Sequence, residues 1–108
     1  MCRMYASTDP ARYGSTTRSV RLQGYVTSVR LENEFWDILD ALAAEQSVST
    51  SRFISQLHDE VVADRGEVGN LASLLRVSCA VYLHARAERA RHAPPSRDSG
   101  AWPAIRAG

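Results

Sequence analysis

Residues 25–36 read YVTSVRLENEFW, and the change of periodicity inside this stretch decides the fold. Up to residue 31, apolar and polar side chains alternate, which is typical of a β-strand with one buried face. The side chains expected to point outward are Val26, Ser28 and Arg30, and those expected to point inward are Thr27, Val29 and Leu31. After residue 32 the apolar residues recur at helical spacing, so the strand is predicted to run directly into a helix.

Three helical patterns follow the strand. Asn33 is predicted to cap the first helix, which should end near Gln46. Ser49 is predicted to cap the second helix, and Gly66 is a natural stop for it. Asn70 is the expected cap of a third helix that continues to about residue 90. Its wide apolar face, which includes a cysteine expected to be a small buried hydrophobe (Cys79), predicts burial on more than one side.

The strand needs a partner for its backbone groups. The tetrapeptide SVRL occurs at residues 19–22 and again at 28–31, which predicts extended backbone with one apolar face at both places. The simplest partner of the second strand is the same strand of another copy, because a two-fold antiparallel ribbon satisfies both chains. The protein is therefore expected to be a homodimer. The third helix could close that dimer or pair dimers into tetramers.

The chain of 108 residues is long enough for one compact domain. We expect an N-terminal arm or extended segment over residues 1–24 and a strand-helix-helix core over 25–66. An additional helix over 67–90 should pack on this core, and the composition of residues 91–108 predicts a disordered tail. No apolar run is long enough for a signal peptide or a membrane span, so a cytoplasmic location is expected.

Charge is distributed unevenly along the chain. Residues 1–31 hold five arginines and one acid, and residues 32–68 hold nine acids and two arginines. From residue 69 onward there are six arginines and two acids. Residues 1–31 are therefore expected to attract anions, although the exclusive use of arginine as the basic residue is equally consistent with a coding bias.

The string TSVRLENEFW at residues 27–36 and the string NLASLLRV at 70–77 resemble short bacterial ribbon-helix-helix proteins. TRSVRL at residues 17–22 is similar to an N-terminal segment found in part of that family, and the likeness extends over residues 2–83. It implies a mainly α fold with a short β-ribbon, built as an intertwined homodimer and carrying an additional C-terminal helix. The Arc and Met repressors of this class regulate transcription by inserting a two-stranded ribbon into the DNA major groove.

The resemblance assigns two sets of residues to binding of double-stranded DNA. The base-reading positions of such a ribbon correspond to Val26, Ser28 and Arg30. The expected phosphate contacts are Ser49, Thr50 and Ser51 at the start of the second helix, with Arg52, Arg18 and Arg21. Each set has a plainer interpretation. Arg30, Arg18 and Arg21 could simply solvate a strand, and the three hydroxyl residues could do no more than begin a helix.

Other functions find less support in the sequence. His58, His84 and His92 are too far apart for a metal site, and His58 is expected on a solvated helix face. We expect no cofactor, no metal and no enzymatic activity. The main alternative is an antitoxin-like scaffold that binds a protein partner through the third helix and the tail. A helix-turn-helix over residues 34–64 is disfavoured, because its second helix is acidic. Trp36 lies off the apolar stripe and is expected to pack against the third helix or a second copy.

Overall fold

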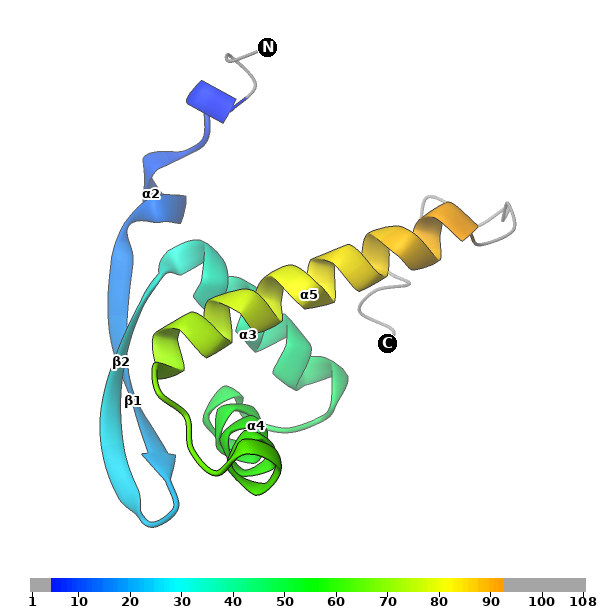
Figure 1. The fold of residues 1–108 in the computed structure, drawn as a ribbon. Coiled ribbons are helices and arrows are strands. Elements are labelled where there is room, and N and C mark those ends of the chain that lie inside the picture. The colour runs from blue at the N-terminus through cyan, green and yellow to red at the C-terminus, as the bar shows by residue number, and fades with distance from the viewer. Residues whose placement is uncertain (1–4, 93–108) are drawn as a thin grey trace.

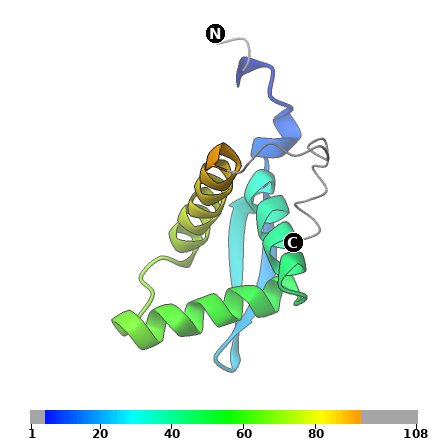
Figure 2. The same ribbon diagram turned by 90° about the vertical axis from the view of Figure 1, so that its right-hand side faces the viewer.

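The computed structural model describes residues 5–92, in which a β-hairpin stands beside three long helices (Figure 1). In chain order the elements are α2 (Pro10–Tyr13), β1 (Ser15–Leu22), β2 (Tyr25–Glu32), α3 (Asn33–Glu45), α4 (Thr50–Arg65) and α5 (Leu71–His92). The helices lie on one face of the hairpin, and α4 crosses below α3 and α5 (Figure 2). This confirms the predicted fold class of helices with a short two-stranded sheet.

β1 and β2 form an antiparallel pair in which Leu22 lies opposite Tyr25. The connection is Gln23-Gly24, and both residues have positive φ, at 47° and 91°, as a type I′ turn requires. The two SVRL repeats therefore fall on opposite strands. The structure corrects the expectation that β2 lacks a partner within its own chain, because β1, which begins inside the segment expected to be an arm, pairs with it.

The core fills the space between the inner face of the hairpin and the helices. The largest fully buried side chains come from β2 and all three long helices: Leu31, Trp36, Leu39, Ile54, Leu75 and Cys79. Burying an apolar side chain of this size contributes about 1.5–3 kcal/mol to folding. The expected burial of Cys79 is confirmed, and burial raises the pKa of its thiol to about 11.

The junction between β2 and α3 contains no loop. Glu32 is both the last residue of β2 and the N-cap position of α3, so Asn33 lies one residue later than the cap predicted for it. The Asn33 side chain donates to the carbonyl of Ala11 at 2.8 Å and accepts from the Thr16 hydroxyl at 2.5 Å. Asn33 thus joins α2 and β1 to the start of α3.

The predicted starts of α4 and α5 and the predicted end of α4 are confirmed, whereas α5 continues to His92, beyond its predicted end near residue 90. The Ser49 hydroxyl oxygen accepts from the amide of Arg52 at 3.1 Å, and Gly66 ends α4 with φ 93°. Asn70 accepts from the amide of Ser73 at 3.1 Å, which caps α5. These side chains satisfy backbone donors that a helix start leaves without partners.

α5 is less buried than its sequence predicts. Of its side chains only Leu75 and Cys79 are buried, whereas Val77 is 60% exposed, Val81 61% and Leu83 45%. The second half of the helix extends past α3 (Figure 1). No described helix is long and apolar enough to cross a membrane. The predicted tail lies outside the described residues from position 93 onward, and residues 91–92 form the end of α5.

Candidate nucleic-acid interface

The outward face of the hairpin is the surface on which the predicted base-reading residues meet. Val26, Ser28 and Arg30 of β2 are all exposed, while Val29 and Leu31 are buried and Thr27 is half-buried. The predicted division of the strand into two faces is therefore confirmed. β1 adds three exposed side chains to the outward face. In register these cross-strand pairs are Thr17 with Arg30, Ser19 with Ser28, and Arg21 with Val26.

The positive charge on this face comes from Arg21 and Arg30. Among residues 5–92, neither Arg21 nor Arg30 forms an ion pair or a side-chain hydrogen bond, and the acid at the next outward position of β2, Glu32, is paired with Arg76. The two guanidinium groups come from different strands and from different ends of the paired segment, because Arg21 is near the turn and Arg30 is near α3. The face therefore presents two cations separated by small hydroxyl side chains.

Three acids of the negative central segment are instead neutralised by arginines from other elements. Their ion pairs are Glu34 with Arg12 at 2.7 Å, Asp40 with Arg18 at 2.9 Å, and Glu32 with Arg76 at 3.0 Å. In each pair the hydrogen bond from the arginine lowers the pKa of the carboxyl group below its ordinary value. In the folded protein, the negative charge of residues 32–68 is thus partly compensated by arginines from outside that segment.

Arg18 does not join Arg21 on the outward face. Its guanidinium donates two hydrogen bonds to the Asp40 carboxylate, at 2.9 and 3.1 Å, and lies 4.4 Å from the centre of the Trp36 ring. The indole nitrogen of Trp36 donates to the carbonyl of Thr16 at 2.8 Å. Trp36 therefore contacts β1, a contact that was not predicted, and both terminal nitrogens of Arg18 are already bonded to Asp40.

The start of α4, a predicted phosphate site, is already in contact with a carboxylate. The Thr50 hydroxyl donates to the Asp40 carboxylate at 2.6 Å, while Ser51 is half-buried and Arg52 is exposed. A carboxylate beside a helix N-terminus takes the position that favours an anion and repels phosphate. The structure brings Arg18 and Thr50 together through Asp40. The role of Asp40 was not predicted from the sequence, because no local pattern links Arg18 to a residue 22 positions away.

His58 is placed differently from its prediction. It is 7% exposed rather than on a solvated face, and its Nδ1 atom has no hydrogen-bond partner and lies 3.8 Å from the Asp59 carboxylate. Within residues 5–92 no three histidine, cysteine or acidic side chains gather in a way that could hold a metal ion.

The outer edge of β2 carries backbone groups that do not bond to β1. The amide of Asn33 donates to the carbonyl of Gly14 at 2.7 Å, which extends the ladder by one step beyond the strands. Since bonded pairs recur at every second residue, odd-numbered residues of β2 bond to β1, and the N–H and C=O groups of Val26, Ser28 and Arg30 point to the opposite edge.

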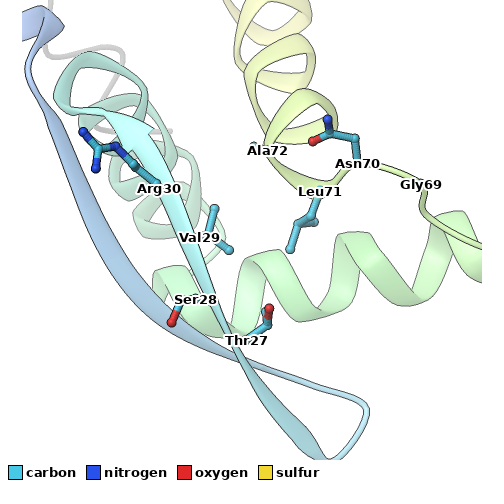
Figure 3. Close-up of a pocket in the computed structure, with 8 residues that line it drawn as sticks. All are labelled: Thr27, Ser28, Val29, Arg30, Gly69, Asn70, Leu71 and Ala72. Atoms are coloured by element: carbon cyan, nitrogen blue, oxygen red, sulfur yellow. The ribbon is translucent and has the colours of Figure 1, made fainter.

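A hollow lies beside this edge, between β2 and the start of α5. Its lining residues are Thr27, Ser28, Val29, Arg30, Gly69, Asn70, Leu71 and Ala72. Figure 3 shows Val29 and Leu71 on the helix side of β2, whereas Ser28 and Arg30 project from the other side of the strand. The free edge and the outward face thus meet along one strand.

β2 leads without a loop into consecutive helices, which is the strand-helix-helix order of the ribbon-helix-helix class. The model of the ribbon-helix-helix domain matches residues 15–83, and the chain belongs to this family. A solved structure, that of an uncharacterized protein from Bordetella pertussis Tohama I, is similar at 42% sequence identity and a TM-score of 0.79. The match covers 82% of this chain and 70% of that protein. No functionally curated protein matches the chain.

Proposed function

We propose that this protein is a transcriptional regulator that binds double-stranded DNA as a homodimer through the outward face of its hairpin. The observation that carries the proposal is the pair of exposed arginines, Arg21 and Arg30, on a face whose acid at the end of β2, Glu32, is paired with Arg76. Proteins of the ribbon-helix-helix family generally bind DNA. A cationic surface of this kind attracts phosphate and places arginine forks where base edges can be read.

The free edge of β2 supports pairing with a second copy. Only the even-numbered residues present outward backbone groups, so a two-fold axis must pass through a residue position, and those nearest the centre of the strand are Ser28 and Val29. With the axis through Val29, Glu32 of one copy would have to pair with Val26 of the other, and the Glu32 side chain is already held by Arg76. We therefore favour the axis through Ser28. Arg30 of one copy then lies opposite Val26 of the other, which avoids placing like charges directly opposite each other.

The dimer would have a sheet of four strands, with the two β2 strands at the centre. Adjacent strands are about 4.8 Å apart, so the two β1 strands would lie roughly 14 Å apart. The major groove is about 12 Å wide, so the two central β2 strands would fit inside the groove. The two β1 strands would then lie above the phosphate backbones at its edges. Val26, Ser28 and Arg30 are accordingly proposed to face bases, and Arg21 to face phosphate.

Two of the expected phosphate contacts receive less support. Arg18 is held by Asp40 on the inner side of the hairpin, and Asp40 also receives the hydroxyl of Thr50 at the start of α4. We therefore assign neither Arg18 nor Thr50 to DNA. Ser49 serves as the helix cap, and Arg52 is exposed beside it. The proposed contact set is confined to the hairpin.

Arg30 is proposed to make the main base contact, since a bidentate arginine on guanine gives about 1–3 kcal/mol of discrimination. The test is binding of the native protein, Arg30→Ala and Arg65→Ala to a library of duplexes over a series of salt concentrations. Arg65 is a matched control, because it is an exposed arginine at the far end of α4. We expect salt-dependent binding and a loss of selectivity in Arg30→Ala alone. A folded native dimer that binds no duplex at low salt would contradict the proposal.

One observation favours a second function, docking of a protein partner. Val77 and Val81 leave an apolar surface on α5 that the described residues do not cover, and Leu83 is exposed on another side of the helix. If the protein is a scaffold, this surface would bind the protein partner, and the same experiment would show no DNA binding.

A further inference from the structure

The outer stripe of α5, defined as Leu74, Val77 and Val81, is apolar but does not face the core. Val77 and Val81 are about three-fifths exposed, and Leu74 is half-buried. The spacing of three and four residues puts the three side chains along one side of the helix. Leu75 and Cys79, which are fully buried, belong to the opposite side. A helix with apolar side chains on both sides is typical of one that packs in two directions.

We infer that the outer stripe of α5 packs against a second copy of this chain and supplies the apolar part of the dimer interface. The inference rests on the homodimer of the proposed function and names the surface that stabilises it. α5 begins at the edge where the copies are proposed to pair, because Leu71 and Ala72 line the same hollow as residues 27–30. Leu74 follows within the next turn, so the stripe continues that edge.

The size of a stable interface supports a contribution from α5. Specific dimers bury about 1,200–2,000 Å² in total, and a pair of short strands is only marginally stable in water. The β2 edge offers the backbone groups of three residues, Val26, Ser28 and Arg30. Strand pairing alone is therefore too small, and an adjoining apolar surface is needed.

The charge pattern of α5 favours its own copy as the occupant. Between Leu71 and Leu83 the only charged residue is Arg76, and its guanidinium is held by Glu32. Such a surface can meet itself across a two-fold axis without opposing like charges. The basic residues follow only in the second half of the helix, where Arg86, Arg89 and Arg91 stand. The neutral half thus fits a symmetric interface, and the basic half does not.

The test is the oligomeric state of a Val77→Glu/Val81→Glu variant, measured by sedimentation over a concentration series without DNA. Leu83→Glu is the matched control, because Leu83 is exposed on another side of the same helix. We expect the double variant to raise the dimer Kd about a hundredfold or more, since it puts like charges where apolar surface is buried. Leu83→Glu should dimerise like the native protein. Circular dichroism verifies that each variant is folded.

Two outcomes would overturn the inference. If the double variant dimerises as well as the native protein while Ser28→Pro is monomeric, the strand edge forms the dimer without α5. If the native protein is monomeric at every concentration, the proposed homodimer itself fails. Should the double glutamate variant not fold, Val77→Ala/Val81→Ala replaces it, because alanine favours helix, and a rise in Kd of about tenfold is then expected.

Discussion

Arg30 and Arg21 lie on one exposed face but at different distances from the proposed dimer axis, since β1 lies outside β2. We predict that Arg21→Ala weakens binding to all duplexes about equally and lowers the salt slope by about one for each phosphate that is no longer neutralised. Arg30→Ala should instead change the base preference. Competition with a randomised duplex library, repeated at several salt concentrations, separates the two effects. A changed base preference in Arg21→Ala would contradict this assignment.

Asp40 joins three elements, because it accepts hydrogen bonds from Arg18 of β1 and Thr50 of α4. We predict that Asp40→Asn lowers the free energy of unfolding by about 1 kcal/mol, since it removes charge-assisted hydrogen bonds at a partly exposed site. Asp37→Asn is the control, because Asp37 is exposed on the same helix. Urea denaturation of both variants measures the difference. Equal stability of the two would show that the pair with Arg18 contributes little.

At the scale of elements, local patterns predicted most of the fold. Alternation assigned the two faces of β2, because the side-chain period of a strand is two. Ser49, Gly66 and Asn70 marked helix ends through chemistry that involves only neighbouring residues. The hairpin was missed, although it had a signal: two SVRL repeats that flank a short segment containing Gly24, whose φ is 91°.

Ser28 and Ser19 lie opposite each other and provide a matched test of the two sheet edges. Each points its N–H away from the other strand, Ser28 toward the outer edge of β2 and Ser19 toward the outer edge of β1. Proline has no N–H and is tolerated at a sheet edge. We predict that Ser28→Pro prevents dimerisation while Ser19→Pro does not, measured by light scattering after chromatography. If both variants are dimeric, the β2 edge does not form the dimer interface.

Across the whole molecule, three ion pairs join elements that are far apart in the sequence, and the sequence could not reveal them. Arg12, Arg18 and Arg76 reach acids 22 or 44 residues away, and nothing in the local pattern selects those partners. The exposure of Val77 and Val81 was equally hidden, because it depends on how few elements pack against α5. Local conformation could thus be predicted from the sequence, whereas pairing between distant residues could not.

The same ion pairs predict how stability depends on pH. Arginine hydrogen bonds lower the pKa of Glu32, Glu34 and Asp40 in the folded state. A lowered pKa means that the unfolded chain binds protons more readily, so stability is present above the ordinary pKa and is lost as pH falls. We predict a falling melting temperature from about pH 5 downward. Asp40→Asn should reduce the slope, and a flat profile down to about pH 3 would contradict the prediction.

The hairpin has a consequence for the order of folding and association in the proposed homodimer. A ribbon made only from two chains cannot form until those chains meet, so its folding depends on concentration. Here β1 and β2 are joined by two residues, and such local contacts form quickly within one chain. A newly made copy can therefore complete its own sheet and core before it finds a partner. In the proposed homodimer, association would then be a separate step that follows folding, so the amount of the proposed DNA-binding form would depend on the concentration of folded protein.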